Sequence, residues 1–367
     1  MISKKITHLI TTIERGGAEK QLLTLASEQV QSGLTVEVIF LKGKSELKKE
    51  FEESGVEVNK LLAGKSFLKQ ISLLSKYLRK NPSPIHAHLP KSELLAAIVV
   101  PNKCLIFTRH NSEPFWPAGP RIISNLLSRF VCRRASQGIA ISNAVKSYLI
   151  KRGEIPNGYT IDVVYYGFQK DISTNSLGMN LITNLMNGRN SNYKIGTIGR
   201  LVPQKDYPTL LNAFSNILKS LPSTDLYVVG EGYLQKDLIE LSKSLGINGK
   251  VHWLGKTEYI KEFLSKIDLF ILPSKYEGFG LVLLEAMVAK KPIIAANNSA
   301  IHEVLGKSYE GLFLTGDANA LAQQINTALS DKNFLERLVQ SYSSQLELFD
   351  PSKMNSNIKK VYTDAGF

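Results

Sequence analysis

Short runs of aliphatic and β-branched residues alternate with amphipathic segments along almost the whole chain. The first run, Lys5–Ile10, precedes Ala18–Gln31, whose apolar residues recur at helical spacing until Gly33 ends the pattern. Further runs predict strands at Thr35–Leu41, Ile85–His88, Leu105–Thr108, Gly138–Ile141 and Ile161–Tyr165. Because strands that alternate with helices form parallel sheets covered on both faces, this half of the chain predicts an α/β domain.

The alternation stops between Asp171 and Asn192, where Ser, Asn, Gly and Met follow no clear period and predict a linker. A second series of apolar runs then predicts strands at Lys194–Ile198, Asp225–Val229, Lys250–Trp253, Asp268–Leu272, Pro292–Ala296 and Gly311–Leu314. We expect two Rossmann-like, doubly wound α/β domains facing across a cleft, at residues 1–172 and 193–350, with the linker at 173–192. A last helix at 351–367 is expected to pack back on the first domain.

The composition is that of an ordinary soluble protein, with 367 residues, 43% apolar and 21% charged. No apolar run approaches the roughly 18–20 residues that cross a bilayer, and His8, Thr11 and Glu14 interrupt any signal-peptide core. The two cysteines, Cys104 and Cys132, lie in apolar segments and favour neither a disulfide framework nor a metal cluster. A reducing cytoplasm is therefore the simplest expected compartment.

Positive charge is concentrated in the first half of the chain. Through Asp171 there are 25 Lys+Arg and 14 Asp+Glu, a net charge of +11, whereas the remainder has 20 and 18, or +2. Such asymmetry indicates an anionic partner, namely a lipid surface, a nucleic acid or a phosphorylated substrate, unless it is only a solvated basic face. The Tyr and Trp residues show no stacking pattern for nucleic acid, so we expect no nucleic-acid partner.

Ligands of parallel α/β sheets bind beyond the carboxyl ends of the strands, so the loops that follow strands are the places to look for chemistry. The loop after Lys5–Ile10 contains Gly16 and Gly17, which allow a ligand to approach the backbone, and the next helix offers free N–H groups to an anion. A plain tight turn explains the two glycines equally well. The loop is not G-x-G-x-x-G, which disfavours a dinucleotide site.

Two later loops carry charged side chains. Arg200 and Lys205 follow the first strand of the second domain and can converge on one diphosphate, although surface solubility explains such residues too. Glu277 lies on the loop after Asp268–Leu272, and Glu285 lies about one turn into the following helix. Both carboxylates can face the same cleft and accept hydrogen bonds from sugar hydroxyls, unless they are two incidental acidic residues of an exposed helix.

Taken together, the order and spacing of these residues resemble the retaining glycosyltransferases of family 4, which have the GT-B fold. The resemblance covers nearly the whole chain and is strongest from Lys194 to Leu314. The matching pieces are Gly16-Gly17-Ala18-Glu19, His110, Ala140-Ile141-Ser142, Tyr166-Gly167, Gly199-Arg200 with Lys205, Gly230-Glu231-Gly232, the Glu277/Glu285 pair, Pro292-Ile293-Ile294-Ala295 and Glu303.

The resemblance implies specific roles for these residues. Arg200 and Lys205 would hold the nucleotide diphosphate and neutralise the charge that grows on the leaving group. Glu285 would bind the ribose hydroxyls, and Glu277 would face the donor sugar. His110 matches a histidine that lies near the transferred sugar. The catalytic set is thus His110, Arg200, Lys205 and Glu277, and the other implied donor-binding residues are Gly16, Gly17, Gly230, Glu231, Gly278, Phe279, Gly280 and Glu285.

Two further histidines, His86 and His88, alternate on one predicted strand and so face the same side of the sheet. A satisfied structural role is at least as reasonable for them as a functional one, although His88 could reach the acceptor cleft. His252 and His302 receive no role.

Some positions depart from the family pattern. Asp206 stands where the family usually has Gly after the Lys, Lys290–Lys291 replace a Gly-containing turn, and Ser299–Ala300 replace a commonly seen Gly pair. These changes bear on loop conformation and donor preference. No Asp-x-Asp is present in the sequence, so we expect no metal cofactor, with Arg200 and Lys205 supplying the positive charge instead.

The resemblance therefore implies a retaining hexosyl- or N-acetylhexosaminyltransferase that uses a nucleotide sugar. UDP is favoured and GDP stays open. The expected acceptor is lipid-linked or a polysaccharide of a bacterial-type surface glycan such as lipopolysaccharide, O-antigen or capsule. The alternatives are a nucleotide-sugar epimerase on the same two-domain plan and a noncatalytic nucleotide-sugar or glycan-binding protein. A dinucleotide oxidoreductase fits least, because its glycine fingerprint is missing.

The basic first half also fits a cytoplasmic enzyme that associates peripherally with the anionic inner face of the membrane. The candidate contact is the segment Arg121–Arg134, which combines arginines with an apolar face made of Ile122, Ile123, Leu126, Leu127 and Phe130. A core helix with a basic outer face is the alternative interpretation.

Overall fold

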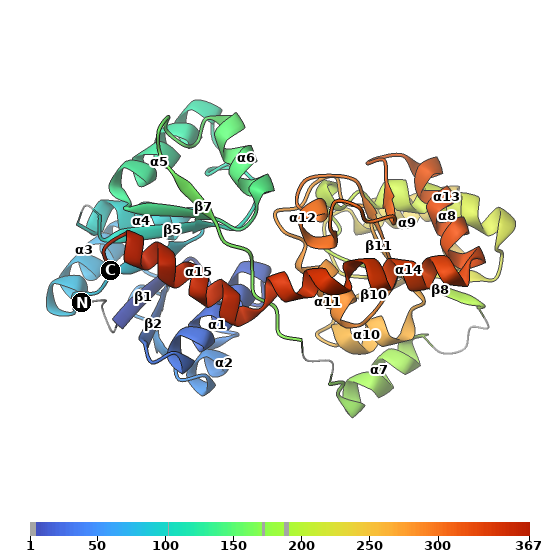
Figure 1. The fold of residues 1–367 in the computed structure, drawn as a ribbon, viewed down its shortest axis with the longest axis horizontal. Coiled ribbons are helices and arrows are strands. Elements are labelled where there is room, and N and C mark those ends of the chain that lie inside the picture. The colour runs from blue at the N-terminus through green and yellow to red at the C-terminus, as the bar shows by residue number, and fades with distance from the viewer. Residues whose placement is uncertain (1–4, 102, 171–172, 187–190) are drawn as a thin grey trace. The chain divides into compact units, whose positions relative to one another are not determined.

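The computed structural model describes residues 5–101, 103–170, 173–186 and 191–367. The chain forms two compact units, which are Met1–Gln169 with Leu348–Phe367 and Lys170–Glu347 (Figure 1).

The first unit is built on a seven-stranded parallel sheet in the order β3-β2-β1-β4-β5-β6-β7. Its strands are β1 (Lys5–Ile10), β2 (Thr35–Phe40), β3 (Glu57–Asn59), β4 (Ile85–His88), β5 (Leu105–Arg109), β6 (Gln137–Ala140) and β7 (Ile161–Val163). The helices of this unit are α1 (Gly17–Gln31), α2 (Lys48–Glu53), α3 (Phe67–Lys80), α4 (Pro90–Val99), α5 (Arg121–Arg134), α6 (Asn143–Arg152) and α15 (Pro351–Asp364).

The second unit repeats the plan with a six-stranded parallel sheet in the order β10-β9-β8-β11-β12-β13. Its strands are β8 (Tyr193–Ile198), β9 (Thr224–Val229), β10 (Val251–Gly255), β11 (Leu269–Leu272), β12 (Ile293–Ala296) and β13 (Leu312–Phe313). The helices are α7 (Ser176–Met186), α8 (Tyr207–Ser220), α9 (Gln235–Ser244), α10 (Ile260–Lys266), α11 (Leu281–Val288), α12 (Ile301–Leu305), α13 (Ala318–Ser330) and α14 (Lys332–Ser343).

Both sheets reverse their strand order once, between β1 and β4 in the first unit and between β8 and β11 in the second. Such a reversal leaves a crevice at the carboxyl ends of the two central strands, where open α/β sheets bind their ligands. The central strands are apolar along their length because helices cover both faces of the sheet: all four residues of β11, Leu269–Leu272, are buried. The doubly wound α/β fold predicted from the sequence is confirmed in both units.

The end of the chain completes the first unit. Helix α15 packs against α1 (Figure 1), and its residues Met354, Ile358 and Val361 belong to the same buried core as strands β1 and β2. Asn355 fixes the pairing, because its side-chain amide donates to the backbone oxygen of Glu28 at 3.1 Å.

The structure differs from the sequence-based expectation in the segment 173–192. The segment was expected to be a linker without a clear period, but Ser176–Met186 forms helix α7, and residues 187–190 lie outside the described part of the chain. The helix is held to α10, since Gly178 lies against the Tyr259 ring and the N–H of Asn175 donates to the carboxylate of Glu262 at 2.6 Å. The sequence analysis interpreted the Asn and Gly residues of the segment as a sign of a linker and therefore missed the helical spacing of Ile182 and Met186.

Within the described residues, every helix is too short or too polar to traverse a bilayer.

Candidate functional site

The predicted charged cluster of the second unit lies on the two loops that flank the reversal of strand order. The loop after β8 carries Arg200 and ends in a 3-10 turn, Pro203–Lys205. Gln204 ties this loop to the one after β11: its side-chain amide donates to the backbone oxygen of Tyr276 at 2.9 Å, and its own backbone oxygen accepts from the N–H of Lys275 at 2.8 Å. Two segments far apart in sequence are therefore held as one surface.

Lys205 and Glu277 form an ion pair in this cluster, with 2.5 Å between Nζ and Oε1. The side chains are only 14% and 7% exposed, so the attraction is screened less than at an open surface. Arg200 is exposed, and its Nη2 donates to Oε1 of Gln204 at 3.5 Å. The structure thus brings three of the four predicted catalytic residues, Arg200, Lys205 and Glu277, onto neighbouring loops.

Glu277 is positioned from its other side by the loop after β12. Its backbone N–H donates to Oγ of Ser299 at 2.9 Å, and that hydroxyl donates to Oδ1 of Asn298 at 2.7 Å. The side-chain amide of Asn298 in turn donates to the backbone oxygen of Ser274 at 2.6 Å. Sequence analysis missed Asn298, although it lies two residues after the predicted strand Pro292–Ala296.

The segment from Gly278 to Glu285 leads from the loop into helix α11. Gly280 is the residue before the helix, with a φ of +88°, and provides no side-chain cap for the first-turn N–H groups. Phe279 is buried and Glu285 is half-buried in the second turn of the helix. Free N–H groups at a helix start favour an anionic ligand. The assignment of these residues to donor binding stays a prediction.

Gly230 and Gly232 have a structural reason to be glycine. A Cβ on Gly230 would lie 2.0 Å from the backbone oxygen of Gly199, and one on Gly232 would lie 2.3 Å from that of Leu201. The two loops after β8 and β9 therefore pack backbone against backbone. Between the two glycines, Oε1 of Glu231 accepts from the N–H of Lys256 at 3.3 Å, which connects this loop to the one after β10.

The three departures from the family pattern occur at left-handed backbone positions. Asp206, Lys290 and Ser299 have φ values of +48°, +53° and +36°, a region in which glycine is the favoured residue. Two of these side chains form bonds that glycine cannot: Asp206 accepts from the Thr209 hydroxyl at 2.8 Å, and Ser299 supports Glu277 as described above.

In the first unit, the predicted glycine loop lies before α1, with Gly16 as the residue that precedes the helix. The carboxylate of Glu19 folds over this glycine, since a Cβ on Gly16 would lie 2.3 Å from Oε2, and Oε1 accepts from the Thr12 hydroxyl at 2.6 Å. An acidic side chain thus occupies the start of the helix, where its charge is favourable. The role of Gly16 and Gly17 in donor binding stays a prediction.

His110 belongs to a chain of hydrogen bonds that runs through the interior of the first unit. In order, the links join Tyr166 Oη to His110 Nδ1 (2.6 Å), His110 Nε2 to His88 Nδ1 (3.0 Å), His88 Nε2 to His8 Nδ1 (2.9 Å) and His8 Nε2 to Gln29 Oε1 (2.7 Å). Because the Gln29 oxygen only accepts, neutral histidines fit in one direction, with each Nε2–H donating along the chain and Tyr166 donating to His110. Both ring nitrogens of His110 are therefore engaged inside the unit.

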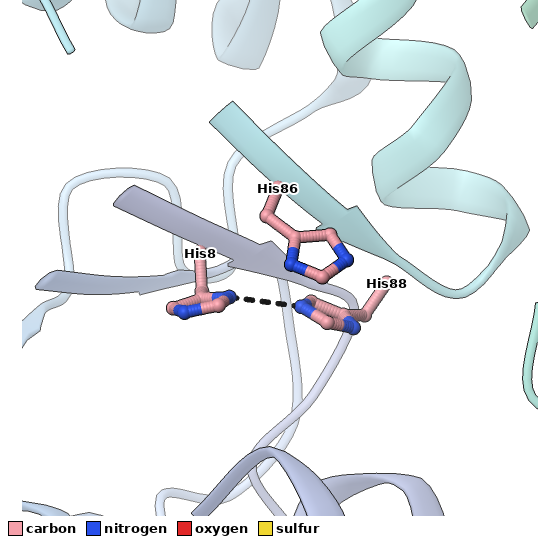
Figure 2. Close-up of side chains that lie close together, drawn as sticks. All are labelled: His8, His86 and His88. Carbon is pink, nitrogen blue, oxygen red and sulfur yellow. Dashed lines mark hydrogen bonds between the residues drawn. The ribbon is translucent and has the colours of Figure 1, made fainter. Parts of the chain in front are cut away.

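His86 joins the same network from the neighbouring position of β4. Its Nδ1 bonds to the Tyr362 hydroxyl at 2.8 Å and its Nε2 to the Thr108 hydroxyl at 2.7 Å. Figure 2 shows His86 beside the hydrogen-bonded pair of His8 and His88. One ligand nitrogen from each of these three histidines lies within 4.8 Å of the others, the spacing of a metal site. All six ring nitrogens already have hydrogen-bond partners, so the cluster is satisfied as a structural network.

Burial keeps these imidazoles neutral. Desolvation lowers the pKa of His8 to about 4, against the weaker raising effect of its hydrogen bond to Gln29, and it lowers the pKa of His110 to about 3. The pKa values of His86 and His88 fall well below the ordinary value for the same reason, with further lowering from the neighbouring histidines. Sequence analysis missed His8, which parallel pairing places opposite His86 in the sheet.

The two Rossmann-like units, each with its reversal of strand order, define the GT-B class of glycosyltransferase fold. Residues 15–169 match the family described as Glycosyltransferase Family 4, and residues 187–344 match the one described as glycosyl transferases group 1. This chain belongs to glycosyltransferase family 4.

Individual relatives agree with this assignment. The chain is 24% identical, over 98% of each protein, to a Campylobacter jejuni enzyme named GalNAc-alpha-(1->4)-GalNAc-alpha-(1->3)-diNAcBac-PP-undecaprenol alpha-1,4-N-acetyl-D-galactosaminyltransferase. It is 28% identical over 145 residues to the lipopolysaccharide core biosynthesis glycosyltransferase LpsE of Rhizobium meliloti, a match that spans 39% of this chain and 42% of LpsE. The fold is similar to that of Anabaena HepE in complex with UDP and glucose, with a TM-score of 0.82 and 23% identity over 98% of this chain and 99% of HepE.

Proposed function

We propose that the chain is a retaining glycosyltransferase that moves a hexose or an N-acetylhexosamine from a nucleotide sugar, with UDP-sugars favoured, to a lipid-linked or polysaccharide acceptor in surface-glycan synthesis. The observation that carries the proposal is the joining of Arg200, Lys205 and Glu277 at the reversal of strand order in the second unit. The UDP complex of HepE supports the donor class. The names of the two relatives support the acceptor class.

The cluster supplies the charges that such a transfer needs. When the bond between sugar and diphosphate breaks, negative charge grows on the departing phosphate, and fixed positive charges beside it lower the barrier. Arg200 and Lys205 provide these charges in our proposal. Glu277 holds the ammonium of Lys205 in the structure, so an arriving diphosphate competes for Lys205, and the carboxylate can then accept a hydrogen bond from a sugar hydroxyl.

Retention of the anomeric configuration follows, in this proposal, from attack on the face that the leaving group departs from, with the departing phosphate helping to take the acceptor proton. Positioning and leaving-group stabilisation then do most of the catalysis. We propose that the reaction needs no divalent metal, because Arg200 and Lys205 supply the positive charge. We further propose a cytoplasmic enzyme that associates peripherally with the anionic membrane face, where lipid-linked acceptors are found.

The test is a donor screen that follows nucleoside diphosphate release from UDP-, GDP- and ADP-sugars in EDTA, with membrane extract as the acceptor source. We expect release from one donor and a loss of about 100-fold in Arg200→Ala, the size typical for removing one stabilising group from a transition state. The matched control is Arg337→Ala, an exposed arginine of the same unit that pairs with Glu310 at 3.7 Å. Its activity should equal that of the unaltered protein.

Each other outcome has a defined meaning. Release that needs added Mg²⁺ or Mn²⁺ would overturn the metal-free part of the proposal. An epimerised or eliminated sugar formed from donor alone would favour the epimerase alternative. The absence of binding and turnover with every donor would favour a noncatalytic glycan-binding protein.

A further inference from the structure

Helix α5 of the first unit carries large apolar side chains on its outer face. Ile122, Ile123, Leu126 and Phe130 are 74%, 43%, 59% and 38% exposed. Residues 122, 126 and 130 are spaced by four and therefore form one stripe along the helix. Single exposed apolar residues are ordinary, but a continuous apolar patch marks an interaction surface. The alternative of a core helix requires this apolar face to be buried, and the structure shows it exposed.

The inner face of α5 is correspondingly polar, because it serves a buried ion network. Arg109 lies 2.7 Å from Glu93 and 3.3 Å from Glu154, and all three side chains are at most 4% exposed. Ser128, on the buried face of α5, accepts from Arg109 Nη2 at 3.0 Å and donates to the backbone oxygen of Glu154 at 2.9 Å. The buried face of α5 thus contains two serines, Ser124 and Ser128, besides Val131 and Cys132, while its largest apolar side chains lie on the outer face.

Two more exposed apolar side chains lie on segments that are hydrogen-bonded to α5. The side chain of Trp116 is 44% exposed, and the backbone N–H of this residue donates to the hydroxyl of Ser124 on α5 at 3.0 Å. Ile150, 54% exposed, lies in the last turn of α6, and the backbone oxygen of Arg152 at the end of that helix accepts from the side chains of Arg121 and Asn125 of α5. Figure 1 shows α5 and α6 at the same end of the first unit. We define the α5 surface as Trp116, Ile122, Ile123, Leu126, Phe130 and Ile150.

The two helices that carry most of the α5 surface are basic. Helices α5 and α6 together contain no Asp or Glu, and their basic residues are Arg121, Arg129, Arg133, Arg134, Lys146, Lys151 and Arg152. A second copy of the chain would bring the same cations to face these, so self-association through this surface is electrostatically unfavourable. An anionic bilayer complements both features, since its headgroups attract the cations and its acyl boundary accepts the apolar side chains.

We propose that the α5 surface is the membrane-docking site of this protein and that it takes an anionic phospholipid bilayer, with α5 lying parallel to the membrane plane. The inference deepens the proposed function by naming the surface that meets the membrane. The biological purpose of docking rests on the proposed function, but the docking itself does not, since vesicle binding is measured without any sugar transfer.

The test is co-sedimentation of the full chain with vesicles of phosphatidylcholine alone or with about one-third phosphatidylglycerol. We expect partitioning at least tenfold stronger on the anionic vesicles, and weaker binding at high salt. The double variant Ile122→Ser/Leu126→Ser should lose about tenfold or more of this partitioning. The matched control is Leu177→Ser/Leu181→Ser on α7, where two leucines of the second unit are 59% and 43% exposed, and it should bind as well as the unaltered protein.

A local readout complements the sedimentation. The chain has two tryptophans, Trp116 and Trp253, so Trp253→Phe leaves Trp116 as the single fluorophore. We expect a blue shift on anionic vesicles and quenching by brominated acyl chains, as for an indole at the membrane interface. In the Trp116→Phe variant, the remaining Trp253 should show neither change.

Four outcomes would overturn the proposal: equal binding to both vesicle types, an equal loss in the α7 control, unquenched Trp116, or a dimer in solution that the α5 double variant dissolves. Far-UV circular dichroism and urea unfolding of each variant separate loss of docking from loss of fold. Membrane docking in a protein that turns over no donor would contradict the proposed function and still support the membrane-docking site. Turnover of a donor without docking would do the reverse.

Discussion

At the scale of single residues, the pairing of Lys205 with Glu277 sets opposite expectations for the two side chains. A diphosphate is attracted by the ammonium and repelled by the carboxylate. Glu277→Gln should therefore tighten UDP binding by about tenfold, or 1.4 kcal/mol, while lowering sugar transfer by about 100-fold. Lys205→Met should weaken both. Calorimetric titration with UDP and a transfer assay measure the two effects.

The matched control for this pair is Glu310→Gln, an exposed carboxylate of the second unit that pairs with Arg337 at 3.7 Å. UDP affinity and transfer should both stay unchanged in this variant. Weaker UDP binding in Glu277→Gln would show that the carboxylate supports the diphosphate site and would contradict the competition for Lys205.

Lys290 tests the cost of a side chain in a left-handed conformation. It follows α11 with a φ of +53° and is exposed, so its Cβ is strained without any compensating burial. A non-glycine residue in this conformation destabilises the folded state by about 1–2 kcal/mol. Glycine avoids this strain but is more flexible in the unfolded chain, which lowers the stability of the glycine variant by about 0.5–1 kcal/mol. Lys290→Gly should therefore raise the free energy of unfolding by about 0.5–1 kcal/mol, as measured by urea titration.

Lys307 provides the comparison for Lys290. It is also exposed, but it is absent from the left-handed residues of the described chain. Lys307→Gly should lower the free energy of unfolding by about 0.4–1 kcal/mol, because glycine gains freedom in the unfolded chain and relieves no strain. Effects of the same sign in the two variants would refute the strain interpretation.

At the scale of an element, the structure of helix α5 predicts that its buried Ser128 matters more for stability than its exposed Leu126. Ser128→Ala would leave Arg109 and Glu154 short of one hydrogen bond each in a buried network, which should cost about 1–3 kcal/mol. Leu126→Ser on the outer face should change the free energy of unfolding by less than about 0.5 kcal/mol. Urea unfolding of both variants decides the matter, and a larger loss in Leu126→Ser would place that side chain in the core.

The elements themselves differ in how far the sequence predicted them. All twelve predicted strands exist, with ends within two residues of the observed ones, because a strand buried on both faces needs a continuous apolar run. The edge strand β3 was missed, since Glu57–Asn59 has only three residues and two of them are polar. The loops that carry Arg200, Lys205 and Glu277 were predictable from the rule on strand ends. The histidine chain was not, because it depends on which strands pair and in what register.

At the scale of the whole molecule, the histidine network connects parts of the first unit that are far apart in sequence. His8 comes from β1 and His86 and His88 from β4, while His110 follows β5. The hydroxyl of Tyr362 on α15 accepts from the side-chain amide of Gln29 at 3.2 Å and bonds to His86. The network is contained in the first unit, so its protonation should affect the two units unequally.

The sign of this effect follows from the lowered pKa values. The unfolded histidines take up protons below about pH 6.5, whereas folded His8 does so only near pH 4 and folded His110 near pH 3. The unfolded state therefore binds more protons between pH 6.5 and about 4. As the pH is lowered through this range, the free energy of unfolding of the first unit decreases by about 1.4 kcal/mol per pH unit for each histidine. Burial raises the pKa of Glu93 to about 7, against the opposing effect of Arg109. The folded Glu93 carboxyl therefore takes up a proton in the same pH range, which offsets the contribution of one of the four histidines of the network.

Hydrogen exchange measured by mass spectrometry at pH 7 and pH 5 tests this on the full chain, after correction for the intrinsic exchange rate. Backbone amides of β1, β4 and β5 should lose protection at pH 5, while those of β8 and β11 in the second unit should change much less. His88→Gln should make the pH dependence of the first unit shallower, because it removes one of the titrating groups. His252→Gln, in the second unit, should leave it unaltered. Equal loss of protection in both units of the unaltered protein would show that the histidine network does not govern the acid sensitivity of the first.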